Sequence, residues 1–351
     1  MTEITYPPLN ESGEEALYQQ SHKMWHPVAY SDDVTDQPFS FQLLDRPLVA
    51  VRLGGEISVF KDLCIHRGSA LSLGKVIGNE IQCPYHGWRF NSEGLCTLIP
   101  SRPNGSIPKK ARIEKYQAVD AGGMVWVCLD ENPIFPIPIF NEWNDPKYRV
   151  VRIPLYDWHS SAARRIENFV DFSHFPFVHE GILGLPDKAE IPDHEVFRNE
   201  NTIVFELGIE EPTNELKGDA ELNVVVQRKP SKYTISMPYT VELNQPLEDD
   251  HHFVLFMASS PISRKETRTF CFCARNYDMD QNRDASYVDF QNVILEQDRV
   301  VIESQRPEEL PIDLSEELHI KGVDRVSIDY RKWLQELAYT YSNSKTEGVF
   351  S

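Results

Sequence analysis

The chain has 351 residues, enough for two domains, and its 41% apolar and 25% charged residues are typical of a globular protein. Lys and Arg number 35 against 54 Asp and Glu, a net charge of −19, which excludes nucleic acid or an anionic membrane surface as the main partner. No apolar run in the sequence approaches the roughly 18 residues of a membrane span.

Residues 1–24 are predicted to form a polar N-terminal arm, either loose or with a short helix. They lack the basic and apolar regions of a secretory signal. A disulfide framework is not expected among the six cysteines of such a chain, which predicts a cytoplasmic protein. Four of these cysteines lie outside any metal-ligand pattern, and we expect them to be small buried side chains: Cys96, Cys128, Cys271 and Cys273.

Residues 25–132 are predicted to form a small all-β domain. Short runs with strand character at 48–53, 57–60, 88–90 and 124–129 are bounded by glycine and asparagine turns. The next segment holds Pro133, Pro136 and Pro138, and proline lacks the N–H that a helix or strand interior needs. We therefore expect a linker here, followed by a second domain over residues 133–351.

The second domain mixes helical and strand patterns. Apolar periodicity predicts helices over 162–172, 286–304 and 330–341. Strands are predicted over 202–207, 222–226, 233–236, 252–258 and 267–274. Consecutive strands flanked by helices indicate an α+β domain, in which an antiparallel sheet carries helices on one side.

The first metal-ligand pattern lies in the all-β domain. Cys64 and His66 form a C-x-H pair, and Cys83 and His86 form a C-x-x-H pair. Two thiolates and two imidazoles suit zinc or an iron–sulfur cluster. A structural zinc site prefers C-x-x-C and H-x3–5-H pairs, whereas here each loop supplies one Cys and one His. A Rieske [2Fe–2S] cluster needs that arrangement, because two Cys hold one iron and two His hold the other.

The second metal-ligand pattern lies at the end of the predicted helix 162–172. Asp171 precedes His174 by three residues, and His179 follows five residues after His174. A spacing of five does not place two side chains on one face of an ideal helix. Pro176 bends or breaks the segment between them, so the two imidazoles can still converge. Two histidines alone are weak evidence of a metal, and the pattern becomes informative only with its neighbours.

Together the two patterns resemble the Rieske non-haem iron oxygenase family over nearly the whole chain. The strings CPYHGW and ENFVDFSHFPFVH carry the resemblance. It implies an α+β catalytic domain of the helix-grip type, a [2Fe–2S] cluster on the four Cys and His ligands, and a mononuclear Fe(II). The iron ligands implied are His174, His179 and a distant carboxylate, for which Asp298 matches the family. On sequence alone, Glu296 and Glu303 compete with Asp298.

The resemblance also implies roles for two further residues. Asp171 would bridge an iron-binding imidazole of one subunit to a cluster imidazole of the next, and Asn168 would lie near the iron. A bridge between subunits implies a ring, in this family a homotrimer. Because no G-x-G-x-x-G fingerprint is present, electrons would come from a separate ferredoxin-type or flavin reductase.

The reaction implied is monooxygenation of a small nitrogenous molecule by O2. The strings SMPYTVEL, VIESQRP and YRKWL are similar to those of bacterial methylxanthine N-demethylases and cyanobacterial guanidinium-alkaloid hydroxylases. Hydroxylation and N-demethylation both stay open, and O-demethylation and cis-dihydroxylation are the alternatives. A pure electron carrier would not need the second domain. We expect the substrate pocket around Phe205, Met237, Val254 and Phe256.

Overall fold

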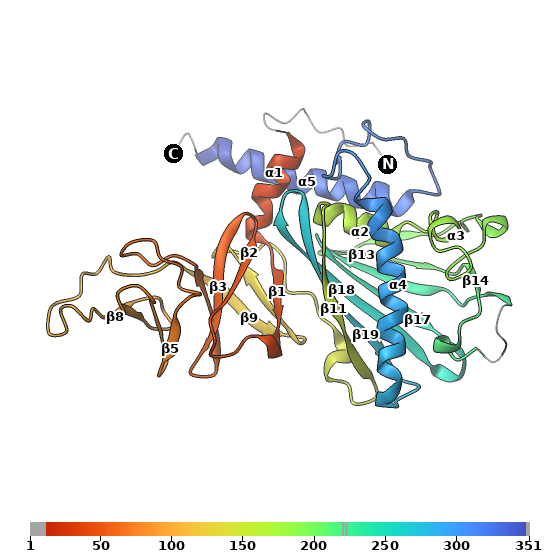
Figure 1. The fold of residues 1–351 in the computed structure, drawn as a ribbon. Helices are drawn as coiled ribbons and strands as arrows, with labels where there is room; N and C mark the ends of the chain where they lie inside the picture. Colours follow the sequence, from red (N-terminus) through yellow and green to blue (C-terminus); the bar gives the residue numbers. More distant parts are fainter. Residues whose placement is uncertain (1–11, 220, 222–223, 349–351) are drawn as a thin grey trace. The chain divides into compact units, whose positions relative to one another are not determined.

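The structure, a computed structural model, describes residues 12–219, 221 and 224–348. It divides into two compact units (Figure 1). One unit is His22–Ile137, and the other joins the residues up to Ser21 to the chain from Pro138 onward. Across the described ranges, no helix is long and apolar enough to cross a membrane.

The unit His22–Ile137 is built from strands, which confirms the predicted all-β character. A six-stranded antiparallel sheet has the order β1-β10-β9-β4-β3-β2, and a four-stranded sheet has the order β5-β6-β7-β8. The strands are β1 His26–Tyr30, β2 Phe39–Leu43, β3 Arg46–Leu53, β4 Glu56–Lys61, β5 Lys75–Ile77, β6 Glu80–Gln82, β7 Arg89–Phe90, β8 Cys96–Leu98, β9 Lys115–Ala121 and β10 Met124–Cys128.

The core of this unit holds the two loops that carry the cysteine and histidine pairs. Val49 and Phe60 of the larger sheet and Ile81 and Phe90 of the smaller one are fully buried in one apolar cluster. Leu71, in the loop between β4 and β5, is buried in the same cluster. The loop β4–β5 and the loop β6–β7 are therefore anchored by packing at both ends.

The other unit contains a seven-stranded antiparallel sheet, which confirms the α+β prediction. Its order is β11-β19-β18-β17-β16-β13-β12, and a small hairpin pairs β14 with β15. The strands are β11 Arg149–Trp158, β12 Val196–Arg198, β13 Thr202–Leu207, β14 Glu210–Pro212, β15 Val225–Gln227, β16 Ser231–Ser236, β17 Thr240–Pro246, β18 His252–Ser263 and β19 Glu266–Arg275.

The helices of this unit are close to those predicted from periodicity. Their bounds are α1 Gly13–Gln20, α2 Ala162–Val170, α3 Phe175–Val178, α4 Asp284–Ile302 and α5 Arg325–Gly348. Helices α2 and α4 cross one face of the seven-stranded sheet, and α1 packs against α5 (Figure 1). Ser161 caps the start of α2, and its hydroxyl accepts a hydrogen bond from the Arg164 N–H at 3.3 Å.

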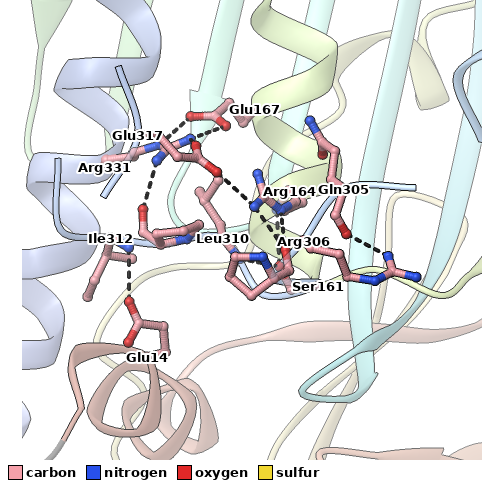
Figure 2. A network of polar contacts seen from close by, with 12 residues as sticks. Glu14, Ser161, Arg164, Glu167, Gln305, Arg306, Leu310, Ile312, Glu317 and Arg331 are labelled. Atoms are coloured by element: carbon pink, nitrogen blue, oxygen red, sulfur yellow. Dashed lines mark hydrogen bonds and ion pairs between the residues drawn. The ribbon is translucent and has the colours of Figure 1, made fainter. Parts of the chain in front are cut away.

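A buried ion-pair network holds the outer face of α2 (Figure 2). Arg331 of α5 donates from its Nε and Nη2 to the two Glu167 carboxylate oxygens, each at 2.6 Å, and its Nη2 also pairs with Glu317 at 2.5 Å. Arg164 reaches the other Glu317 oxygen at 2.9 Å and the Pro307 carbonyl at 2.9 and 3.0 Å. These contacts fix α2 to α5 and to the segment that follows α4.

Two acidic side chains lie on the sheet face opposite α2. Glu242 pairs with Phe256 across β17 and β18, and Phe256 stacks on Phe140 with ring centroids 4.8 Å apart. Glu142 is 8% exposed, and one of its carboxylate oxygens is buried without a hydrogen-bond partner among the described residues. Burial, together with the charge of Glu142, raises the pKa of Glu242 from 4.5 to about 7.

Because the pKa of Glu242 is raised, the folded protein is expected to lose stability as the pH rises. The folded state keeps a proton that the unfolded chain loses above pH 4.5, so ionisation costs stability between pH 4.5 and about 7. Glu242→Gln is therefore expected to increase the free energy of unfolding by about 1–2 kcal/mol at pH 8 and to change it little at pH 4. Urea unfolding at the two pH values measures this. The exposed Glu206→Gln is the control, and an equal gain at both pH values would contradict the prediction.

Candidate metal centres and active site

The two loops of the all-β unit fold into equivalent turns. The Gly68 N–H donates to the Cys64 carbonyl at 2.9 Å, and the Gly87 N–H donates to the Cys83 carbonyl at 3.1 Å. Gly68 and Gly87 have φ values of 70° and 68°, in the left-handed region that side chains other than glycine rarely adopt. Each turn therefore presents its Cys and its His from the same backbone shape.

The ligand set on these turns fits a Rieske cluster. Cys64 and Cys83 are free and buried, and burial together with the neighbouring thiol of Cys83 raises the pKa of Cys64 to about 11. The rings of His66 and His86 lie 4.5 Å apart between centroids. The Nδ1 of His66 is buried and has no hydrogen-bond partner among the described residues. A metal ligand bond would satisfy this nitrogen, and two thiolates beside two imidazoles are the donors of a [2Fe–2S] centre.

The segment after α2 brings the two histidines of the second pattern together. Helix α2 ends at Val170, because Asp171 turns to extended backbone with φ −89° and ψ 120°. His174 and His179 then flank the single turn of α3, with Pro176 inside it. The chain leaves helical geometry at His179, and the two rings converge despite their spacing of five residues.

Asp298 of α4 completes a triad with these histidines. Its Oδ1 lies 3.2 Å from the Nε2 of His174 and 3.0 Å from the Nε2 of His179, and the two Nε2 atoms are 3.3 Å apart. A triangle of this size matches one face of an octahedron with ligand bonds of about 2.2 Å. In the described part of the chain, no other group of three His, Cys, Asp or Glu residues brings its ligand atoms within 4.8 Å of one another.

Outer hydrogen bonds orient both imidazoles toward the centre of the triad. The Nδ1 of His174 faces the Asp171 carboxylate at 3.4 Å, and the Nδ1 of His179 faces the Oε1 of Gln297 at 2.8 Å. When each neutral imidazole donates its Nδ1 proton outward, its Nε2 can turn a lone pair inward to a metal ion. Three acceptors that converge in a buried space fit a bound cation.

Gln297 gives a testable prediction about this arrangement. In Gln297→Leu, His179 loses the acceptor for its Nδ1–H, so the affinity for Fe(II) is expected to fall about 10- to 100-fold. Anaerobic competition with a chromophoric chelator measures the affinity. Glu296→Gln, which changes an exposed neighbour on the same helix, is the matched control. Unchanged affinity in Gln297→Leu would show that the tautomer of His179 is fixed by another group.

The carboxylates and imidazoles shift one another's ionisation strongly. Burial alone would lower the pKa of His174, but hydrogen bonds to Asp171 and Asp298 outweigh it and raise the pKa to about 9. Burial would raise the pKa of Asp298, but hydrogen bonds to the two histidines and the nearby Arg165 charge hold it well below its ordinary value. Asp298 is thus an anion in the position that a cation would neutralise.

The structure separates Asp298 from the two carboxylates that compete with it in sequence. Glu296 and Glu303 both pair with Arg299, at 2.5 Å and 2.9 Å, along the side of α4. The Glu296 side chain is 61% exposed, whereas that of Asp298 is 8% exposed and faces the histidines. The geometry therefore places Asp298, and neither glutamate, in the triad.

The triad lies in the wall of a cavity of about 840 Å³, open mouth included. Leu243, Leu255 and Met257 give it an apolar floor from the sheet. A polar corner faces this floor. It consists of Glu211, Lys217 and Arg228, and the Oε1 of Glu211 accepts from Lys217 at 2.7 Å and from Arg228 at 2.6 Å. The cavity therefore combines a metal-ligand triad, an apolar floor and a fixed set of charges.

The predicted pocket residues were wrong in detail. Val254 and Phe256 lie on the opposite face of the sheet, because successive side chains of a strand alternate between faces. Phe205 is on the correct face, but it is covered by Phe172 at 5.9 Å and stacks on Tyr233 at 5.0 Å. Met237 follows the end of β16 and does not line the cavity.

Sequence reasoning also missed two residues around the triad. Gln297 precedes Asp298 directly, and nothing in its residue type distinguishes it from a solvated glutamine. Arg165 is 1% exposed, although its position in α2 next to Arg164 resembles an ordinary charged helix face. Asn168, which was predicted to lie near the iron, donates from its Nδ2 to the Oδ1 of Asp298 at 3.2 Å.

Comparisons with known families agree with both halves of the chain. Residues 24–117 match the Rieske [2Fe-2S] domain, and residues 158–340 match the vanillate O-demethylase oxygenase C-terminal domain. Among solved structures under 25% identity, dicamba monooxygenase bound to dicamba has the same fold. It has a TM-score of 0.80 at 19% identity and covers 92% of this chain and 98% of that one.

Two demethylases of Pseudomonas putida are similar over almost the full length. Methylxanthine N1-demethylase NdmA is 36% identical, with coverage of 89% of this chain and 88% of the relative. Methylxanthine N3-demethylase NdmB is 35% identical, with coverage of 90% and 88%. The structure of NdmA with caffeine has a TM-score of 0.82 at 34% identity and covers 93% of this chain and 94% of that one.

Relatives of this kind use a small-molecule substrate, O2 and electrons from a separate protein. With its [2Fe–2S] domain and its non-haem iron oxygenase domain, the chain belongs to the Rieske non-haem iron oxygenase family and is a terminal oxygenase of the monooxygenase type.

Proposed function

We propose that this oxygenase hydroxylates a C–H bond of a small nitrogenous molecule, and that oxidative N-demethylation is its main reaction. The observation that carries the proposal is the triad of His174, His179 and Asp298 in the wall of a substrate-sized cavity. Two histidines and one carboxylate are the donor set of non-haem Fe(II) oxygenases and would leave positions open on a bound iron for dioxygen. The similarity to two methylxanthine N-demethylases supports the choice of reaction.

The residues around the triad have distinct tasks in this proposal. His174, His179 and Asp298 would hold Fe(II), which would supply dioxygen activation when bound. Asp171 and Gln297 hold the imidazole protons on the outer nitrogens, so that both inner lone pairs are available. Leu243, Leu255 and Met257 are among the apolar side chains that exclude water from the reacting carbon.

The overall reaction balances with two electrons from the reductase. One C–H bond, one O2, two electrons and two protons give one C–OH group and one water. If the carbon is a methyl group on nitrogen, the N–CH2OH product breaks its C–N bond. Formaldehyde leaves and the nitrogen gains a hydrogen. Hydroxylation and demethylation therefore differ in the substrate rather than in the site.

The polar corner supports a substrate with hydrogen-bonding groups. Glu211 holds Lys217 and the Nε of Arg228, and Asp219 holds both terminal nitrogens of Arg228, so the polar groups of this corner are already oriented when a ligand enters. A flat heterocycle with ring nitrogens or carbonyl oxygens could lie on the apolar floor and contact this corner. Pockets of this kind use a few fixed polar groups to set the orientation of the ligand.

The test exposes the reduced, iron-loaded protein to isotopically heavy O2 with a panel of N-methyl, O-methyl and unmethylated nitrogen heterocycles. Formaldehyde and product mass are measured together. We expect formaldehyde in step with the loss of one N-methyl group, and none from His174→Ala. A product heavier by one labelled oxygen, without formaldehyde, would make the enzyme a hydroxylase. Equal turnover by His174→Ala would reject the iron site.

A second candidate reaction is O-demethylation. It is favoured by the match of residues 158–340 to the oxygenase domain of vanillate O-demethylase. The chemistry would be the same, with the C–O bond of an O–CH2OH group breaking in place of the C–N bond. If only the O-methyl compounds of the panel lose a methyl group, the enzyme is an O-demethylase.

We further propose a cytoplasmic homotrimer with the cluster-binding set of Cys64, Cys83, His66 and His86. In the ring, Asp171 would accept hydrogen bonds from His174 and from a cluster imidazole of the next subunit. The Asp171 side chain remains 38% exposed while it faces His174, and His86 is exposed as well, which supports such a contact. The location is supported by the six cysteines, all of them described and none in a disulfide.

A further inference from the structure

Arg165 is a buried cation that contacts no carboxylate directly within the described ranges. It is 1% exposed. Its guanidinium donates to the Asn168 Oδ1 at 2.8 Å, to the Tyr156 hydroxyl at 3.1 and 3.3 Å, and to the Met257 sulfur at 2.8 Å. It also lies 4.5 Å from the ring centre of Trp158. Every one of these partners is neutral, although a buried charge is costly without an opposite charge nearby.

The opposite charge is Asp298, which Arg165 reaches through Asn168. The amide of Asn168 accepts from Arg165 on its oxygen at 2.8 Å and donates from its nitrogen to the Asp298 Oδ1 at 3.2 Å. That same Oδ1 faces the Nε2 atoms of His174 and His179. The Asn168 amide therefore connects the permanently charged Arg165 to the Asp298 oxygen that faces both histidines.

The chemistry of the guanidinium permits only one orientation of this amide. Arginine has five donors and no acceptor, so the Asn168 carbonyl oxygen must face Arg165 and the NH2 group must face Asp298. With the amide rotated by half a turn, its NH2 would face the guanidinium and its oxygen would face the carboxylate. Both contacts would then be repulsive.

We propose that Arg165 is a positioning residue for the iron site. It fixes the Asn168 amide so that the amide nitrogen always donates to Asp298, and in this way it holds the Asp298 carboxylate in its ligand orientation. The inference rests on the metal site of the proposed function and adds a residue that acts on the metal only through another side chain. Loss of such an outer contact typically lowers metal affinity about 10- to 100-fold.

The neighbouring Arg164 provides a matched control. It is on the same helix and 2% exposed, but its guanidinium binds the Pro307 carbonyl and Glu317 on the outer face of α2 (Figure 2). Arg164→Met and Arg165→Met remove the same buried charge from adjacent positions. Only the second removes a contact that leads to the triad.

The experiment measures Fe(II) affinity and the electron paramagnetic resonance signal of the Fe(II)–nitric oxide complex in the full chain with its cluster oxidised. The variants are Arg165→Met, Asn168→Ala, the double variant and Arg164→Met. We expect a fall in affinity of about 10- to 100-fold and an altered signal in Arg165→Met, and neither in Arg164→Met. In the Asn168→Ala background, Arg165→Met should cause little further change, because the two residues act in series.

Two results would overturn the inference. One is wild-type affinity and signal in Arg165→Met. The other is a double variant in which the two losses multiply, since Arg165 would then act independently of Asn168. Failure of the proposed iron site itself looks different, because His174→Ala would then bind Fe(II) like the wild type. Arg165→Lys should restore part of the affinity, as it keeps the charge and one donor but loses the planar fork.

Discussion

Replacing Asp298 by alanine should remove the mononuclear iron and abolish turnover while the cluster stays in place. Asp298 supplies the one negative ligand, and its loss leaves two neutral imidazoles that hold Fe(II) too weakly. Elemental analysis should fall from about three to about two iron atoms per chain, with the visible spectrum of the cluster unchanged. Product formation should drop below detection.

The control for this prediction lies two residues earlier on α4. Glu296→Ala removes a carboxylate from the same helix, but that side chain is 61% exposed and pairs with Arg299. It should keep both its iron content and its turnover. If Asp298→Ala still held three iron atoms, the mononuclear iron would be bound elsewhere and the proposed mechanism would fail.

Asp171→Asn should retain both metal centres and yet slow turnover about 100-fold, because an uncharged amide is a poor bridge between two imidazoles. Asparagine keeps the side-chain oxygen that accepts from the Ser173 N–H at 2.8 Å, so the local turn should persist. Stopped-flow absorbance of the reduced cluster, mixed with O2 and substrate, measures electron transfer directly. The exposed Asp187→Asn controls for the loss of a surface charge.

A subunit-mixing experiment tests whether electrons pass between subunits, as the bridging role of Asp171 requires. Chains with Asp298→Ala lack the iron, and chains with His86→Ala lack the cluster, so neither alone should turn over. In randomly mixed trimers about one interface in four joins an intact cluster to an intact iron, which predicts about a quarter of wild-type activity. No recovered activity would place electron transfer within one chain and leave Asp171 without the proposed bridging role.

The two proposed metal-ligand sets follow from the sequence to the extent that their geometry is local. Cys64 and His66, like Cys83 and His86, lie within a few residues of each other and beside a turn glycine, so residue type and spacing carry the signal. Asp298 lies more than a hundred residues from His174. Residue chemistry alone could not separate it from Glu296, and only the family resemblance and then the structure did so.

The parts that sequence reasoning missed depend on side-chain direction in three dimensions. Val254 and Phe256 were expected in the pocket, but strand alternation turns them away and presents Leu255 and Met257 instead. Arg164 and Arg165 look alike in sequence and both are buried. Arg164 binds Glu317, whereas Arg165 points toward the proposed iron ligands. Which of two adjacent arginines is buried against the site depends on how α2 is rotated on the sheet, and tertiary packing decides that rotation.

The polar corner and the iron ligands come from separate stretches of the chain. Glu211, Lys217 and Arg228 lie within residues 210–228, whereas the ligands belong to α4 and to the turn after α2. We therefore expect mutations in this stretch to change the choice of substrate while the proposed iron ligands stay in place. On the proposed function, substrate specificity and iron binding would then be encoded in separate stretches of the sequence. A mutant library aimed at new substrates should be confined to the same stretch.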